Sequence, residues 1–204
     1  MIIEQGGDDE CDPKWIEFYR TYIQDVAQAE DFVRRCELRR PPRHPSRLIM
    51  HQCVRLVETA RDIGTVRPAY QSLQVLLLTI CAEAVAKLQT GAPERGRSRF
   101  HTVRFFTELL PTDRQERLVA TVRSRRGESL TINQVADALY EVRCDAAHEG
   151  QLWSIWLSES GNPTMSAGWD LTVTLRLEEL YEIVVAGCVA AATDLLDKEM
   201  EVPR

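Results

Sequence analysis

One apolar segment, between Pro68 and Gly91, constrains the fold of this 204-residue chain more than any other feature. Its apolar residues recur at three- and four-residue steps, which is typical of the inner face of an α-helix. They are Leu73, Leu76, Leu77, Ile80, Ala84 and Leu88. Pro68 favours the start of a helix, and Gly91-Ala92-Pro93 favours its end. The segment therefore predicts the central helix of a bundle.

The longest uninterrupted apolar runs, Val75–Ile80 and Ile183–Ala192, bear on the question of a membrane. Both are well short of the roughly 20 residues that span a bilayer. The first residues are acidic and lack the basic stretch and apolar core of a secretory signal. We therefore expect a cytoplasmic protein with no membrane partner, whose six cysteines stay reduced.

Helical periodicity extends over most of the remaining chain. Asp12-Pro13 is a good helix start, because Asp can cap the helix and Pro fits its first position. Ser46 is expected to cap the next helix, and Gly64 to end it. Besides the central helix, the patterns predict helices near 14–33, 46–64, 99–109, 112–125, 131–148 and 178–199.

Before the last helix the period changes. Segments 152–157 and 171–175 are rich in aromatic and β-branched residues, and Gly161-Asn162-Pro163 lies between them as turn material. They predict a β-hairpin. We therefore expect a flexible N-terminus, 1–12, followed by one mainly α domain, 13–200. That domain would be a helical bundle with a β-hairpin inserted before its last helix.

Charge is unevenly distributed in a chain whose net charge is −6. Residues 34–126 hold 19 Lys and Arg against 8 Asp and Glu, whereas the rest holds 6 against 23. The basic middle can form a positive face or groove for nucleic acid. The equally weighted alternative is ordinary solvated helix faces. Basic loops at 34–47 and 95–99 would guide RNA only if they flank a cleft.

The sequence contains little that points to a metal or a cofactor. His51 and Cys53 are close in sequence, but structural zinc requires four N or S ligands, and a buried thiol near a surface histidine is the simpler interpretation. We find no phosphate-binding glycine-rich loop, neither the Walker pattern nor G-x-G-x-x-G. We therefore expect no metal site and no cofactor.

The candidate catalytic pair is Arg143 and His148, in the segment Leu139–Gly150 at the end of a predicted helix. Five residues rotate about 140° around an α-helix, so the two side chains would not stack on one face. A long arginine can still reach a cleft that it shares with the histidine. The negative pole of the helix favours a charged imidazole, and Arg143 opposes it. Such a histidine suits proton transfer near neutral pH.

This segment resembles the HEPN family, whose RNA-cutting members carry R-x4–6-H late in a helical bundle. Here the motif is Arg143-x4-His148, preceded by Leu-Tyr-x-Val and followed by Glu-Gly. The motif covers about a dozen residues, and the expected HEPN-like architecture covers nearly the whole chain. Glu83-x3-Lys87 resembles a second, acidic-basic motif of some HEPN proteins. An ordinary i,i+4 salt bridge on one helix is the better explanation of this pair.

The resemblance implies a homodimer in which two copies of the motif meet around RNA. Arg143 would bind the scissile phosphate, and His148 would act as general base, general acid or both in a metal-independent endoribonuclease. Tyr140, Asp145 and Glu149 are the expected supporting residues, with Asp145 able to orient the imidazole. Such a protein could be a toxin or an anti-phage effector, with a protein inhibitor or antitoxin as a further partner.

Two positions depart from the family pattern. Cys144 follows the arginine where active members usually have a polar residue, often Asn. Gly150 stands where one toxin branch has a tyrosine that a partner nucleotidyltransferase modifies, so we do not expect that control. Three alternatives therefore stay open: an inactive HEPN-like RNA-, nucleotide- or protein-binding module; an unrelated helical scaffold; and a structural ion network of Arg143 and His148 with Asp145 or Glu149. Trp153 and Trp156 would pack the hairpin on the bundle or stack on bases.

Overall fold

The computed structural model describes residues 11–38, 43–91, 96–152, 155, 157–165 and 170–200. Helices dominate this part of the chain, as expected. In chain order the elements are α1 (Pro13–Arg20), α2 (Val26–Glu37), α3 (Pro45–Val66), α4 (Gln71–Thr90), α5 (Ser98–Arg104), the π-helical turn η1 (Phe105–Leu109), α6 (Thr112–Ala120), β1 (Val122–Ser124), α7 (Ile132–Cys144), the π-helical turn η2 (Asp145–Glu149), β2 (Thr164–Met165), β3 (Leu171–Val173) and α8 (Leu177–Met200).

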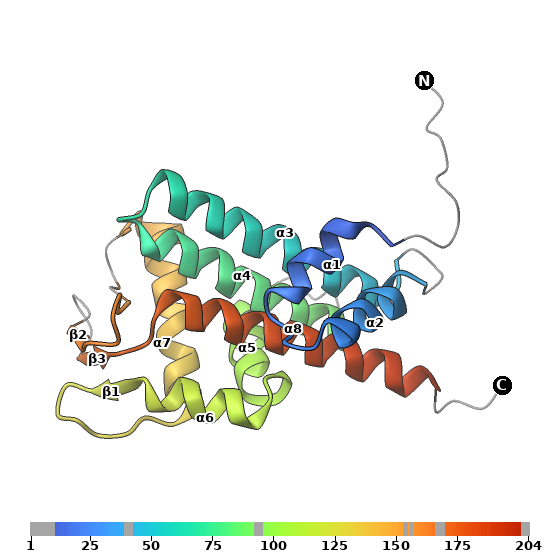
Figure 1. Ribbon diagram of the computed structural model, residues 1–204. Coiled ribbons are helices and arrows are strands. Elements are labelled where there is room, and N and C mark those ends of the chain that lie inside the picture. The colour runs from blue at the N-terminus through green and yellow to red at the C-terminus, as the bar shows by residue number, and fades with distance from the viewer. Residues whose placement is uncertain are drawn as a thin grey trace.

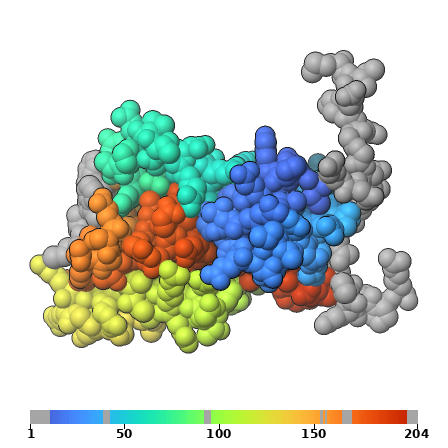
Figure 2. Space-filling model, in the orientation of Figure 1, coloured from blue at the N-terminus to red at the C-terminus, as the bar shows by residue number. Residues whose placement is uncertain are grey.

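Three long helices, α3, α4 and α8, pack against one another and form the centre of the bundle (Figure 1). The helices α1 and α2 cover one end of it, and α6 lies beside α8 (Figure 2). The helix α8 approaches η1 closely, because a Cβ on Gly187 would lie 2.5 Å from the Phe105 ring. The central position predicted for α4 is confirmed.

The helix α4 is also long and apolar enough, by length and composition alone, to cross a membrane. Its mean hydropathy is 1.3, and half of that apolar window is buried inside the protein. Contacts with α3, α5, α7 and α8 account for this burial. Packing in the bundle therefore explains why α4 is so apolar.

The expected single helix at 14–33 is wrong, because the chain bends between α1 and α2. The Asp12 side chain accepts a hydrogen bond from Lys14 N at 3.0 Å, so the predicted start of α1 is confirmed. Asp25 then caps α2 by accepting from Ala27 N at 2.9 Å. A second cap inside one apolar stripe divides it into two helices.

The helix α3 begins and ends outside its predicted bounds. His44, not Ser46, caps it, because His44 Nδ1 accepts from Ser46 N at 3.3 Å. Gly64 does not end α3. A Cβ at Gly64 would lie 2.7 Å from Oε1 of Gln74, and that oxygen accepts a hydrogen bond from the Tyr181 hydroxyl at 2.8 Å. Gly64 therefore lets α3 and α4 come close enough for this buried polar link to α8.

The small sheet is antiparallel, with the strand order β1-β3-β2. The strand β3 lies within the predicted 171–175, and an antiparallel pair does precede α8. Its first strand is β2 rather than 152–157, whose described residues 152, 155 and 157 are not in a strand. The buried Ile155 and Leu157 instead belong to the core. The third strand, β1, occupies the end of the expected helix 112–125, where Val122 pairs with Val173.

The uneven charge distribution is partly neutralised within the fold. Arginines of the basic middle bind carboxylates of the acidic remainder: Arg35 with Asp197, Arg61 with Glu178, Arg99 with Asp137 and Arg117 with Glu179. These arginines are therefore not available as an unpaired positive surface. The arrangement favours ordinary solvated, salt-bridged helix faces over much of the basic middle.

Candidate functional site

The candidate site lies at the end of α7, where the helix changes its hydrogen-bond pattern. At the other end, Thr131 and Gln134 form a capping box that fixes the first turn of α7. In η2 the backbone N–H of Gly150 donates to Asp145 O, five residues earlier, and Gly150 has a φ of +65°. The predicted glycine stop is confirmed. The wider turn was not predicted, and such turns are frequent at functional sites.

This wide turn brings Arg143 and His148 into contact. In a π-helix each hydrogen bond spans five residues instead of four, so the turn is wider and residues five positions apart lie closer around the axis than in an α-helix. Arg143 Nη1 lies 3.3 Å from His148 Nε2. The α-helical rotation of about 140° expected for this interval therefore does not apply here.

The contact between Arg143 and His148 restricts the state of the imidazole. A guanidinium group has only donors, so in this contact His148 Nε2 is the hydrogen-bond acceptor. The Arg143 side chain is 17% exposed, whereas His148 lies on the surface. A substrate from solvent can therefore reach the imidazole, and movement of Arg143 onto that substrate would free Nε2 to act as a general base.

Glu83 of α4 holds the other side of the guanidinium. Its Oε2 lies 3.6 Å from Arg143 Nη2, and its Oε1 accepts hydrogen bonds from Lys87 and, at 2.8 Å, from the Ser98 hydroxyl. Burial alone would raise the pKa of Glu83, but these hydrogen bonds and the charges of Lys87 and Arg143 outweigh burial and lower it. At neutral pH the site therefore holds an ionised carboxylate behind the arginine.

Glu83-x3-Lys87 thus makes the ordinary i,i+4 salt bridge and also belongs to the arginine–histidine site. Both follow from position, because α4 packs against α7 and η2. Ser98 is the member of this group that the sequence analysis missed. It begins α5, and no sequence pattern placed it near Glu83.

Tyr140 lies one turn before Arg143, with the guanidinium carbon 5.8 Å from the centre of its ring. A hydrogen bond with Cys144 and partial burial raise the pKa of Tyr140.

The Arg143 Nε–H group is buried and has no acceptor among the described residues. Leaving such a donor unpaired costs about 1–3 kcal/mol, which is most often tolerated where function requires the residue.

The structure does not bring the other two expected supporting residues against the imidazole. Asp145 lines an open groove with Asp137, Glu141 and Asp170, and among the described residues no hydrogen bond joins it to His148. The Glu149 carboxylate accepts a hydrogen bond from Gln151 Nε2 at 2.8 Å. Both carboxylates lie in the same turn as His148, but among the described contacts neither orients its imidazole.

Several other candidate residues have different surroundings from those weighed in the sequence. Trp153 and Trp156 lie outside the described residues, as do parts of the basic loops at 34–47 and 95–99. His51 does not share a site with Cys53, because its Nε2 contacts Glu37 at 2.5 Å and its ring stacks on Trp15. Cys53 is instead fully buried between helices.

Comparison of the chain with protein-family models, with curated protein sequences and with solved structures gives no match.

Proposed function

We propose that this protein is a metal-independent endoribonuclease of the HEPN type, acting as a cytoplasmic homodimer. The observation that carries the proposal is the contact between Arg143 and His148 at 3.3 Å on an accessible helix end. Arg143 binds the scissile phosphate of RNA, and Glu83 positions the arginine from behind. A role as a toxin or anti-phage effector, with an inhibitor protein as partner, rests on the resemblance in sequence alone.

The proposed reaction needs a proton acceptor and a cation, and the site offers both. The 2′-hydroxyl attacks the neighbouring phosphorus, so nucleophile and target are already in one molecule, which removes much of the entropic barrier. Arg143 turns from His148 to the phosphate, the released Nε2 of His148 accepts the hydroxyl proton, and the P–O5′ bond breaks to leave a 2′,3′-cyclic phosphate and a 5′-hydroxyl. Arg143 stabilises the charge that develops on the phosphate oxygens. In a dimer, the second His148 protonates the leaving oxygen.

Cleavage in the presence of EDTA tests the proposal directly. The purified protein is incubated with RNA and EDTA beside the variants His148→Ala and His51→Ala. The proposal expects cleavage by the unchanged protein and by His51→Ala, and a loss of about 10²–10⁴-fold in His148→Ala, the usual contribution of a general acid–base group. Equal activity in all three proteins contradicts the role of His148.

A single 2′-deoxynucleotide on the 5′ side of the cut site tests the attacking group. The substituted strand should resist cleavage at that position alone, because it lacks the nucleophile. Cleavage at the substituted position would mean that water attacks instead, and the proposed chemistry would then be wrong.

The second candidate function is a non-catalytic RNA-, nucleotide- or protein-binding module. Its supporting observation is that Arg143 is only 17% exposed and already faces Glu83, so part of its charge is neutralised. Cys144, which follows Arg143, forms a hydrogen bond with Tyr140 and is therefore not directed at a substrate. RNA binding that is lost in Arg143→Ala, without any turnover in the unchanged protein, would favour this candidate.

A further inference from the structure

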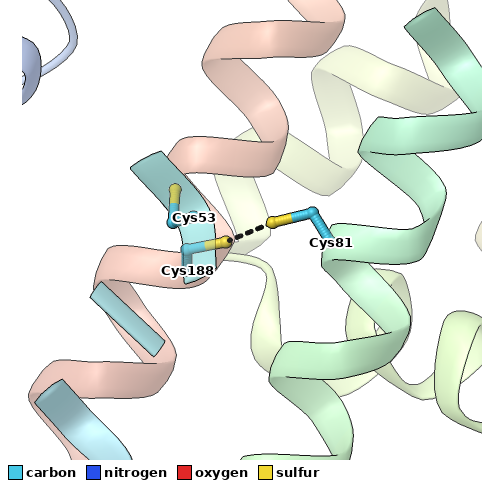
Figure 3. Close-up of side chains that lie close together, drawn as sticks. All are labelled: Cys53, Cys81 and Cys188. Atoms are coloured by element: carbon cyan, nitrogen blue, oxygen red, sulfur yellow. Dashed lines mark hydrogen bonds between the residues drawn. The ribbon is translucent and has the colours of Figure 1, made fainter. Parts of the chain in front are cut away.

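Three cysteines from three different helices meet in the centre of the bundle (Figure 3). They are Cys53 of α3, Cys81 of α4 and Cys188 of α8, and each is 0% exposed. Their sulfur atoms all lie within 4.8 Å of one another, and the sulfurs of Cys81 and Cys188 are 3.7 Å apart. The three thiol groups therefore lie together in one buried cluster.

The spacing fits a three-coordinate ion. Metal–thiolate bonds are about 2.3 Å long. An ion in the plane of three sulfurs with such bonds holds them about 4 Å apart, and an ion with a lone pair lies above that plane and draws them somewhat closer. The observed limit of 4.8 Å therefore requires only small side-chain movements. Zinc would need a fourth ligand, and among the described residues no further histidine, cysteine or carboxylate joins this group.

The net charge of the three thiolates with their ion distinguishes between ions of different valence. Burying an uncompensated charge is costly, and no lysine or arginine among the described residues contributes to the pKa shifts of these three thiols. Three thiolates on a monovalent ion carry a charge of −2, and on a divalent ion −1. On a trivalent ion they are neutral. The core therefore favours a trivalent ion.

Hydrogen bonding also makes one of the thiols easier to ionise. Burial raises the pKa of Cys53, but hydrogen bonds from Cys188, Cys81 and Tyr19 outweigh it, so its pKa lies well below the usual value. The pKa values of Cys81 and Cys188 are raised.

We propose that Cys53, Cys81 and Cys188 form a binding site for one thiophilic trivalent metalloid ion of the arsenic(III) type. Arsenous acid exchanges its three hydroxyl groups for the three sulfurs. Three As–S bonds form, three As–O bonds break, and each hydroxide leaves as water with one thiol proton, so no oxidation state changes. Because the three ligands come from α3, α4 and α8, the bound ion links the central helices and stabilises the fold.

Refolding in the presence of sodium arsenite tests this site. The reduced protein is refolded from urea with and without arsenite, freed of excess reagent and weighed by native mass spectrometry. We expect one arsenic per chain with the loss of three protons, and a higher urea midpoint. The same result is expected for Cys36→Ala, a matched variant that removes a fully buried cysteine outside the cluster.

The variants Cys81→Ala and Cys188→Ala should both fold, as checked by circular dichroism, and should bind arsenite at least about 100-fold more weakly, since even outer-shell partners contribute 10–100-fold. Mapping of the cysteines that arsenite protects from alkylation in the unchanged protein gives an answer even if a variant fails to fold. Protection of other cysteines, or no arsenic in the refolded protein, overturns the site. Tighter binding of cadmium through the same thiols overturns the choice of a trivalent ion.

Discussion

The arginine–histidine site and the three-thiol cluster are built in opposite ways. The first lies at an accessible helix end, and Arg143 and His148 are five residues apart in one helical segment. The second is fully buried, and its members lie in three helices between positions 53 and 188. The comparison teaches that a site formed within one helix can leave a motif in the sequence. A site formed by packing leaves none.

After that of His148→Ala, the largest expected effect is that of Arg143→Ala on RNA cleavage. Removing one preorganised donor from developing charge usually costs about 10²–10³-fold in rate. The free energy of unfolding should change by less than about 1 kcal/mol, because Lys87 still neutralises Glu83. Single-turnover cleavage and urea unfolding measure the two quantities. The control is Arg55→Ala on α3, an exposed arginine that binds Gln52 and should leave both unchanged.

For Gly187→Ala in the core we expect the opposite result, a loss of stability without a loss of RNA cleavage. The new methyl group would lie 2.5 Å from the Phe105 ring. Overpacking of this kind costs about 1–3 kcal/mol, and the better helix propensity of alanine returns less than about 1 kcal/mol of that. Urea unfolding should show the loss, with unchanged cleavage per folded molecule. Ala186→Ser, at the neighbouring position that lines an open groove, should have little effect; equal stability of the two variants would contradict the tight contact.

Glu83→Gln should affect both activity and stability, because Glu83 lies between the core and the site. Loss of its carboxylate frees Arg143 from its anchor, so we expect cleavage to fall about tenfold and stability by about 1 kcal/mol at neutral pH. The folded-state pKa of Glu83 lies below its usual value of 4.5, so this stability is present above about pH 4.5 and is lost as the pH falls. Urea unfolding between pH 7 and 3 should therefore show the two proteins converging in acid. A constant difference would contradict the assignment.

The smallest effect is expected for Glu179→Gln, at a position of α8 that belongs to neither region. Burial would raise the pKa of Glu179, but hydrogen bonds from Arg117 and Arg176 outweigh it and lower the pKa to about 2. The stability that this adds is fully present above about pH 4.5 and is lost between there and about pH 2. With solvent screening we expect about 1 kcal/mol or less. Urea unfolding across this range measures it, and RNA cleavage at neutral pH should not change.

Local sequence patterns predict most of the helices but not how the chain bends between them. The centre of the bundle follows from the apolar stripe between Pro68 and Gly91, and the end of α7 follows from Gly150. The break between α1 and α2 is hidden because the apolar stripe continues across it. The aromatic and β-branched residues of 152–157 indicated a strand, yet Ile155 and Leu157 are buried in the core without strand pairing. In both places tertiary packing, and not the local sequence pattern, sets the conformation of the chain.

The candidate site was only partly predictable for a similar reason. Arg143 and His148 could be selected by residue type and spacing, but apolar periodicity does not reveal that the last turn is a π-helix. Glu83 could be paired with Lys87 from the sequence. Its approach to Arg143 depends on how α4 packs against η2.

The wide turn at 145–149 has a consequence for how the pair could be uncoupled. The Gly150 N–H donates to Asp145 O across five residues, so the main chain sets the spacing of the side chains in this turn. Were the turn to tighten to α-helical spacing, Arg143 and His148 would lie about 140° apart around the helix, and the imidazole would move away from the guanidinium with every side chain intact. A change from π-helical to α-helical hydrogen bonding in this turn would therefore break the contact between Arg143 and His148.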